Sequence, residues 1–421
     1  MKRILVFLSV LLFQFPFRES RAEFLLQPND TLAICGDSIT EQKLYSVFIE
    51  DYLLMCQPTE GLRIAQFGWG GEQVPDFLKR LQSDVFPFKP TVATLCYGMN
   101  DGHYRAMEQT AGDTYRKGLT DSIEALKKSG VRTVLVGSPG VVDPLIYHNG
   151  DAAGAAVYNQ TLGALRDIAQ QVAAQEGVSF TDVHQPMSDV MEKAKAAYGK
   201  DYAFVAGGGI HPNENGHLVM AYAFLKGLGC DGAIGTITVD LASGTAQGTP
   251  GQKIVSASGG TIEVESTRWP FCVRGDPTKP DQTSAAIVRF TPFYQELDRY
   301  MLMVNGLTTA NAKVTWGTQS KNFTAAQLSQ GINLAEEFSE NPFSQPFAKV
   351  DQLVRDQQAF ETVLVKTYLH VMTQFKTFAG PDADALDRIA ASGVARDKEL
   401  FTAANAAVTP VDYTLHIEAV P

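Results

Sequence analysis

Short apolar runs alternate with longer amphipathic stretches between Thr31 and about Gly229. Five of the short runs are predicted to be strands, and several are continuously apolar, as buried parallel strands are. They are Thr31–Cys35, Arg63–Phe67, Thr91–Cys96, Thr133–Val136 and Val178–Thr181. Strands that alternate with helices form a parallel sheet whose two faces are covered by right-handed crossover helices. This half of the chain is therefore predicted to be a three-layer α/β/α domain with a five-stranded parallel sheet.

Two of the crossover helices stand out in the same pattern. Apolar residues recur at three- and four-residue spacing at Tyr115, Leu119, Ile123 and Leu126. Gly130 follows as a stop signal for the helix. A second helix carries one apolar face formed by Tyr158, Leu162, Leu165, Ile168 and Val172. In sheets of this kind, active residues gather beyond the carboxyl ends of the strands.

The pattern changes after residue 229, where alternating runs between glycine-rich turns predict β-strands. The strand candidates are Thr236–Leu241, Thr261–Glu265, Tyr300–Val304 and Tyr413–Ile417. Helical periodicity returns over residues 347–372 and 383–407. We therefore predict one domain over residues 23–229 and a smaller β-rich C-terminal domain with helical additions over residues 230–421.

Charge and cysteine content exclude several classes of function. The formal net charge of −11 is spread along the chain, without a run rich in lysine or arginine. Because nucleic-acid binding needs a basic footprint, we expect no nucleic-acid partner. Five cysteines in 421 residues are too few for a disulfide framework, and they lack the spacing of metal ligands. We expect neither a metal site nor a cofactor.

Residues 1–22 have the pattern of a secretory signal peptide. Lys2 and Arg3 precede an apolar stretch from Ile4 to Phe17, and the small residues Ser20 and Ala22 favour cleavage after Ala22. An uncleaved membrane anchor is the alternative. No later stretch approaches the ~20 consecutive apolar residues of a spanning helix. The mature chain is therefore expected to be secreted or periplasmic and to lack a membrane span.

Ser38 is the first candidate for chemistry, because it follows the first strand in the run Gly36–Thr40. A serine hydroxyl becomes a good nucleophile only when a base takes its proton, and its attack on an ester creates an oxyanion that needs hydrogen-bond donors. A Gly-Asp-Ser tripeptide alone equally suits the start of a helix, where serine is a common cap. The other parts of such a site must therefore be found elsewhere in the chain.

Three further segments supply candidates for those parts. The second and third strands are followed by Gly68–Gln73, which contains Gly71, and by Gly98–Asp101, which contains Asn100. His211 begins the run His211–His217 near the end of the domain. Each segment alone suits an ordinary turn or cap.

Together the four segments resemble the SGNH/GDSL hydrolase family, the GDSL-like lipases and acylhydrolases, over roughly residues 30–228. The matching blocks are Gly36–Thr40, Gly98–Asp101 and His211–Asn213, whereas the second block has Gln66 where the family usually has asparagine. The resemblance implies a flavodoxin-like α/β/α fold and an ester hydrolase. It also implies that Ser38 is the nucleophile and a backbone donor, Gly71 a backbone donor, Asn100 a side-chain donor and His211 the base.

One departure from the family concerns the base. The family usually has aspartate three residues before the histidine, and here that position is Gly208. Losing the third member of a triad costs on the order of three to four decades of rate when nothing replaces it. A backbone carbonyl could orient His211 instead, or Asp201 or Asp182 could reach it. The third explanation is a weakened or non-hydrolytic relative.

Other ring-bearing residues fall near the same segments. His103 could line the cleft, whereas His184 and His217 are expected on turn or helix surfaces. Trp69, Tyr97 and Tyr104 could stack on a sugar ring, although aromatic residues beside a core are also simply packed.

The sequence therefore predicts an exported serine ester hydrolase that uses an acyl-serine route without a cofactor. A small-molecule or polysaccharide ester is the expected substrate, with a carbohydrate acetyl esterase as the leading hypothesis. A lipase-like or thioesterase-like acylhydrolase with a longer acyl pocket is one alternative. A carbohydrate-binding pseudoenzyme, in which Gly208 marks lost catalysis, is the other.

Overall fold

The computed structural model describes residues 23–147, 154–276, 278–281, 283–376 and 378–420. The predicted signal peptide, residues 1–22, lies outside this part of the chain. None of the helices described has both the length and the apolar character needed to cross a lipid bilayer.

Five parallel strands form the central sheet in the order β2-β1-β3-β4-β5, which confirms the predicted α/β fold. They are β1 (Thr31–Gly36), β2 (Arg63–Gly68), β3 (Val92–Cys96), β4 (Thr133–Gly137) and β5 (Ser179–Thr181). Side chains alternate between the two faces of a strand. In β1, Leu32 and Ile34 join one apolar core, whereas Ala33 and Cys35 join the other. Both faces of the sheet are therefore buried.

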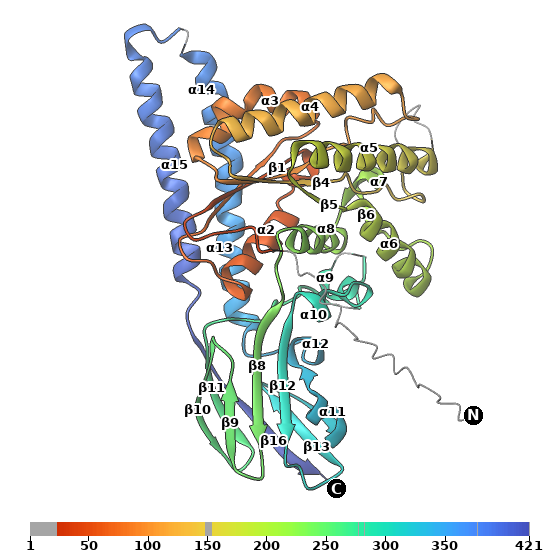
Figure 1. The fold of residues 1–421 in the computed structure, drawn as a ribbon, viewed down its shortest axis with the longest axis vertical. Helices are drawn as coiled ribbons and strands as arrows, with labels where there is room; N and C mark the ends of the chain where they lie inside the picture. Colours follow the sequence, from red (N-terminus) through yellow and green to blue (C-terminus); the bar gives the residue numbers. More distant parts are fainter. Residues whose placement is uncertain (1–22, 148–153, 277, 282, 377, 421) are drawn as a thin grey trace, which may run out of the picture.

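Helices cover the two faces of this sheet (Figure 1). One layer contains α3 (Val74–Arg80), α4 (Gln109–Lys128) and α5 (Ala155–Glu176). The other contains α2 (Tyr45–Asp51), α6 (His184–Tyr198) and α8 (Glu214–Gly227). Short elements connect them, namely α1 (Ser38–Glu41), η1 (Tyr52–Cys56), η2 (Leu81–Val85), η3 (Phe86–Phe88), β6 (Val205–Ala206), α7 (Gly207–Ile210) and β7 (His211–Pro212).

The β-rich part that follows consists of two facing sheets. One has the order β10-β11-β16-β13-β14 and the other the order β15-β12-β8-β9. Tyr300 of one sheet stacks on Trp316 of the other at 5.7 Å and shares a 2.5 Å hydrogen bond with Tyr413. The strands are β8 (Ala233–Asp240), β9 (Thr245–Gly248), β10 (Gln252–Ser258), β11 (Thr261–Ser266), β12 (Arg299–Asn305), β13 (Asn311–Trp316), β14 (Gln319–Thr324), β15 (Ile332–Asn333) and β16 (Val411–Val420).

The long helices of the C-terminal half extend away from these sheets and lie along the α/β domain (Figure 1). The long ones are α13 (Ser344–Val363), η5 (Leu364–Leu369), α14 (His370–Phe375) and α15 (Ala383–Ala406). The short ones are α9 (Ser284–Ile287), η4 (Val288–Phe290), α10 (Phe293–Glu296), α11 (Ala325–Gln330), α12 (Leu334–Glu337) and η6 (Gly380–Asp382).

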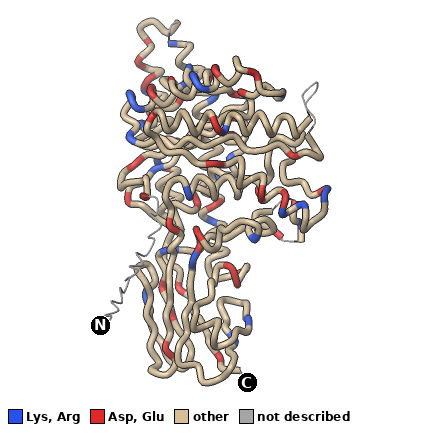
Figure 2. Tube along the Cα trace, turned by 45° about the vertical axis from the view of Figure 1, so that its right-hand side comes forward, with Lys and Arg blue, Asp and Glu red and all other residues tan. Residues whose placement is uncertain are grey.

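Helix α13 packs against α2 and against β2, the edge strand of the parallel sheet, and so covers this edge. Glu361 accepts a hydrogen bond of 2.8 Å from the backbone amide of Gln66, an edge-strand group that would otherwise lack a partner. The helical additions therefore contact both parts of the chain. Acidic and basic residues are interspersed throughout (Figure 2). The proposed boundaries, residues 23–229 and 230–421, stay a prediction.

Candidate active site

Ser38 is the first residue of helix α1, directly after strand β1, and is half-buried. Asp37 caps this helix, since its Oδ1 accepts a hydrogen bond of 2.9 Å from the amide of Ile39. Only glycine fits at Gly36, where a Cβ would lie 2.0 Å from Thr40 Oγ1. The sharp turn holds the Ser38 hydroxyl at the carboxyl edge of the sheet, where ligands bind in open α/β folds.

His211 meets Ser38 although 173 positions separate them in the sequence. Its Nε2 lies 2.8 Å from Ser38 Oγ, a hydrogen-bond distance. The turn before it passes through Gly208 and Gly209, whose φ angles of 74° and 80° favour glycine. A Cβ on Gly209 would lie 2.5 Å from the backbone of Tyr147. The glycine run thus lets the chain pass close to a neighbouring loop and return with His211 facing the serine.

A second histidine, His217, connects the segments that carry Ser38 and His211 through hydrogen bonds. His217 Nδ1 accepts a hydrogen bond of 3.2 Å from the amide of Tyr45, so its Nε2 carries the proton and donates to Gln42 Oε1 at 3.1 Å. Gln42 in turn donates to the carbonyl of Pro212 at 3.4 Å. Burial lowers the pKa of His217 to about 3, and the ring is neutral. This chain of bonds links α1 and α2 to the strand that carries the first histidine.

Gly71 and Asn100 lie in the loops that follow strands β2 and β3. Gly71 has a φ of 74°, and apart from its chain neighbours no described residue has an atom within 4 Å of the place where a Cβ would stand. The amide of Asn100 donates from Nδ2 to the Glu72 carbonyl at 3.0 Å and accepts at Oδ1 from the Tyr104 hydroxyl at 2.6 Å. Within the described residues, the second Nδ2 hydrogen of Asn100 has no acceptor.

The acidic residue beside Gly71 anchors its loop. Glu72 makes a two-pronged ion pair with Arg80, with N–O distances of 2.5 and 2.7 Å, and both side chains are 3 % exposed. Burial raises the pKa of Glu72, and the Arg80 guanidinium opposes that rise. Arg80 also donates to the Phe67 carbonyl at 2.6 Å, and the Tyr97 hydroxyl donates to Glu72 at 2.7 Å. The loop is therefore fixed by charge-assisted hydrogen bonds.

Two buried carboxyl groups flank these loops. Burial raises the pKa of Asp37 and of Asp101 to about 7. Asp101 Oδ1 accepts a hydrogen bond of 3.0 Å from the Val74 amide at the start of α3, which ties the loop after β3 to the helix after β2.

The far ring nitrogen of His211, Nδ1, has no hydrogen-bond partner among the residues that the structure describes. Asp182 instead accepts hydrogen bonds from the Ser138 hydroxyl at 3.2 Å and the Gln185 amide at 3.1 Å. Asp201 is exposed and makes no hydrogen bond to the ring. Neither carboxylate suggested from the sequence orients the histidine here.

Two of the remaining histidines occupy different positions from those expected. His184 and His217 were expected on turn or helix surfaces, and both are buried. The prediction was wrong because each ring has partners inside the fold: His184 Nδ1 lies 2.8 Å from the Gly140 carbonyl. His103 is exposed beside Gln73, with 3.4 Å between His103 Nδ1 and Gln73 Nε2.

The three aromatic candidates differ in their burial and in their contacts. Tyr97 is buried and bonded to Glu72. The ring of Trp69 lies 4.7 Å from the Lys366 ammonium and 5.2 Å from the Arg80 guanidinium, so cations already contact it. Tyr104 is half-buried beside Asn100.

The sequence suggests Tyr104 only as a ring that could stack on a sugar, and its hydrogen bond to Asn100 was missed. Tyr104 lies four residues after Asn100, and that short spacing is the signal that could have indicated the bond. Lys366 was missed altogether. Lys366 forms a 2.6 Å ion pair with Glu41 of helix α1. No local pattern could have found Lys366, because 325 positions separate the two residues.

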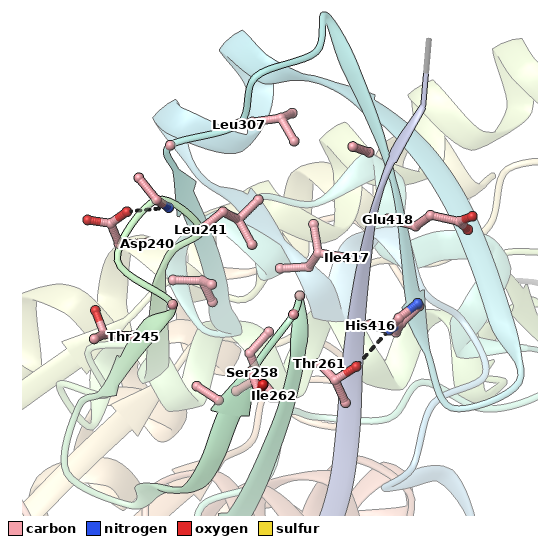
Figure 3. Close-up of a pocket in the computed structure, with 18 of the residues that line it drawn as sticks. Asp240, Leu241, Thr245, Ser258, Thr261, Ile262, Leu307, His416, Ile417 and Glu418 are labelled. Atoms are coloured by element: carbon pink, nitrogen blue, oxygen red, sulfur yellow. Dashed lines mark hydrogen bonds between the residues drawn. The ribbon is translucent and has the colours of Figure 1, made fainter.

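A separate groove of about 450 Å³ lies in the β-rich part (Figure 3). Its walls come from residues 239–242, 244–245, 257–262, 306–308 and 416–419, and none of the four candidate site residues lines it. Leu241, Leu307 and Ile417 are among the aliphatic side chains in it, and the Thr261 hydroxyl pairs with His416 Nδ1 at 3.0 Å. The residues that line the groove include no tyrosine, tryptophan or phenylalanine.

Comparison with known proteins places part of the chain in a family. Residues 34–219 match the model of the GDSL-like Lipase/Acylhydrolase family. An acetylxylan esterase of Geobacillus stearothermophilus is 24 % identical over 226 residues, which are 49 % of this chain and 94 % of that protein.

Among solved structures, a gut microbial diltiazem-metabolizing enzyme has a TM-score of 0.72 and 22 % identity. The match covers 94 % of this chain and 98 % of that one, so the two share the fold over both parts. The crystal structure of the Geobacillus stearothermophilus acetylxylan esterase aligns with 49 % of this chain and 97 % of its own, at 21 % identity and a TM-score of 0.40.

Proposed function

The chain belongs, through residues 34–219, to the GDSL-like lipase/acylhydrolase family of SGNH-type ester hydrolases, and we propose that it is an exported serine esterase with Ser38 as its nucleophile. The observation that carries the proposal is the 2.8 Å distance between His211 Nε2 and Ser38 Oγ. A base at this distance can take the hydroxyl proton during attack.

In the proposed mechanism, His211 Nε2 accepts the proton of Ser38 as Oγ attacks the ester carbonyl carbon. The resulting oxyanion receives hydrogen bonds from the amides of Ser38 and Gly71 and from Asn100 Nδ2. The protonated His211 then gives its proton to the leaving alcohol, and the acyl-serine remains. Water, deprotonated by the same imidazole, attacks the acyl carbon and releases the acid, which restores both side chains.

We propose that the natural substrate is an ester of a small acyl group, acetyl, with a carbohydrate, whose hydroxyl is the leaving alcohol. Support comes from the similarity to an acetylxylan esterase and from the predicted export of the chain. Longer acyl groups remain the alternative that the substrate series below distinguishes.

Export is part of the same proposal. The mature protein, secreted or periplasmic, would begin at Glu23 after removal of residues 1–22. Mass spectrometry of the protein from a secreting host tests this, since a mass that includes residues 1–22 contradicts cleavage.

The esterase proposal is tested with the chain from residue 23 onward and p-nitrophenyl acetate. We expect Ser38→Ala to abolish turnover, whereas Ser392→Ala, which removes an exposed hydroxyl on α15, leaves the rate unchanged. Equal rates for Ser38→Ala and the parent chain would reject a serine esterase. Comparing acetate with octanoate esters then separates a short-acyl esterase from a lipase: higher kcat/KM on octanoate contradicts the acetyl assignment.

A further inference from the structure

The amide of Asn100 has a defined orientation in the structure. The Glu72 carbonyl can only accept hydrogen bonds, so the group that faces it at 3.0 Å must be Nδ2. Oδ1 therefore faces Tyr104, and the tyrosine hydroxyl donates to it over 2.6 Å. The second Nδ2 hydrogen is left for another acceptor.

Hydrogen bonds to the two ends of an amide reinforce each other. A donor on the carbonyl oxygen draws electrons from nitrogen through the conjugated amide, which makes the N–H groups stronger donors. The Tyr104 hydroxyl thus strengthens the free N–H of Asn100 and also restricts rotation of the side chain. Both effects favour preorganised stabilisation of negative charge.

The loop that carries Tyr104 is held in an unfavourable conformation. His103 and Tyr104 are adjacent residues with φ angles of 53° and 58°, and left-handed backbone is unfavourable for a residue other than glycine. Such strain persists only where surrounding contacts impose it, and it concentrates at functional sites. Here the imposing contacts are a 3.1 Å bond from the His103 amide to the Asn100 carbonyl and a 2.8 Å bond from Thr161 Oγ1 to the Arg105 carbonyl.

The ring of Tyr104 is fixed as well. It packs against Tyr158 with 5.2 Å between ring centroids, and the Tyr158 hydroxyl donates to the Met99 carbonyl in the same loop. Burial raises the pKa of Tyr104 to about 12. The hydroxyl therefore keeps its proton, and its role as donor, throughout the neutral range.

We infer that Tyr104 is a positioning residue for the oxyanion hole: its hydroxyl orients and polarises the Asn100 amide so that the free N–H meets the developing oxyanion. The inference rests on the proposed function, because it assigns Tyr104 a role in the Ser38-dependent reaction. Tyr104 acts through Asn100 and needs no contact with the substrate.

The test compares Tyr104→Phe with the parent chain on p-nitrophenyl acetate. Loss of one oxyanion donor costs about 10²–10³ in kcat. Weakening that donor is expected to lower kcat about ten-fold and to leave KM within about two-fold. Tyr115→Phe is the matched control, since it also removes a hydroxyl that bonds loop backbone, the Tyr97 carbonyl at 3.0 Å, without contacting Asn100. It should keep the parent kcat.

A double-mutant cycle separates positioning from general loosening of the loop. In an Asn100→Ala background, Tyr104→Phe is expected to have no further effect on kcat, because the group it positions is gone. The same ten-fold loss in that background would overturn the inference, as would a parent-like kcat for Tyr104→Phe itself. Thermal unfolding, followed by circular dichroism, ensures that every variant is folded at the assay temperature.

Ser38→Ala, run alongside, distinguishes the two claims. When Ser38→Ala is inactive and Tyr104→Phe equals the parent, only the positioning role fails. When Ser38→Ala retains full turnover, the esterase proposal fails and the role of Tyr104 falls with it. A boronic acid, which mimics the tetrahedral intermediate on serine, should bind Tyr104→Phe about ten-fold more weakly; unchanged binding would also contradict the inference.

Discussion

The imidazole of His211 owes its position to backbone that glycine adopts easily. Gly208 and Gly209 both have positive φ, but they differ in surroundings: Gly208 is exposed, whereas a Cβ on Gly209 would lie 2.5 Å from the Tyr147 backbone. An aspartate at 208, the acid expected from the family, would have to take the left-handed conformation. The left-handed conformation of this turn therefore accounts both for the run of glycines and for the absence of an aspartate at position 208.

Gly209→Ala is therefore expected to lower kcat/KM on p-nitrophenyl acetate about 100-fold, because a shift of about 1 Å in a reacting group costs that much. Gly208→Ala shares the unfavourable φ but lies at an exposed position, so a loss of less than about five-fold is expected. Steady-state kinetics on both variants checks this, and equal losses would mean that the close approach to Tyr147 does not position His211.

Among single residues, the sequence located those candidates that directly follow the end of a predicted strand. Ser38, Gly71 and Asn100 each come shortly after a readable strand. The contacts of Tyr104 and His217 could not be predicted, because a hydroxyl that bonds back across a left-handed loop and a buried ring between two helices leave no periodic signal.

Among the elements, the contact between α2 and α13 contains buried acid groups. Glu50 is fully buried and accepts one hydrogen bond of 2.7 Å from Gln358, while its other oxygen has no partner among the residues that the structure describes. Burial raises the pKa of Glu50 well above its usual 4.5, and the negative charges of Asp51 and Asp397 raise it further. The folded protein therefore holds a proton on Glu50 that the unfolded chain releases above pH 4.5.

The folded state binds the Glu50 proton more tightly than the unfolded chain does. The contribution of this proton to the free energy of unfolding is therefore complete below pH 4.5 and is lost as pH rises through the folded pKa of Glu50. Glu50→Gln mimics the protonated acid at every pH. We expect the variant to match the parent chain near pH 4.5 and to gain about 1.4 kcal/mol relative to it for each pH unit above that, up to the folded pKa. Urea unfolding between pH 5 and 9 measures the difference.

Glu399→Gln changes an exposed acid on α15 and serves as the control, with no expected dependence on pH beyond a few tenths of a kcal/mol. A constant difference between Glu50→Gln and the parent chain across the range would show that Glu50 is ionised in the fold.

Helix and strand positions were largely predictable, whereas their partners were not. Periodicity over residues 347–372 and 383–407 matches the helices α13 to α15. An amphipathic face shows that a helix packs on something, but it does not say on what. The contact with strand β2 depends on Glu361 finding an edge amide some 300 positions away, and no local pattern reports that.

For the whole molecule, Arg274 joins segments from both parts of the chain. Its guanidinium bonds Asp51 of α2 at 2.7 Å, pairs with Asp351 of α13 and lies 4.6 Å from the Phe48 ring centroid. Asp51 is fully buried. Removing the partner of a buried charge costs more than the pair itself contributes, since the remaining charge is left uncompensated.

Arg274→Ala is expected to reduce the free energy of unfolding by about 3–5 kcal/mol, measured by urea denaturation. Arg396→Ala breaks an exposed pair with Glu399 and should cost less than about 1 kcal/mol. Similar losses in the free energy of unfolding for the two variants would mean that Arg274 does not couple the two parts of the chain.

The order of the strands and the arrangement of the two parts could not be predicted, because both depend on contacts between residues far apart in the sequence. Strand β1 pairs with β2 and β3, yet the apolar runs of all five strands are alike, so composition alone does not rank neighbours. The order emerges from crossovers and long-range packing.

Strand β16 illustrates how this topology constrains biosynthesis. It lies between β11 and β13 in the middle of its sheet, although it comes after every other strand in the sequence. During translation, β11 and β13 have emerged and still lack the neighbour they share until residues 411–420 leave the ribosome. Their edges must therefore stay apart from other chains in the meantime, and a truncation of those ten residues would leave two unpaired edges exposed to aggregation.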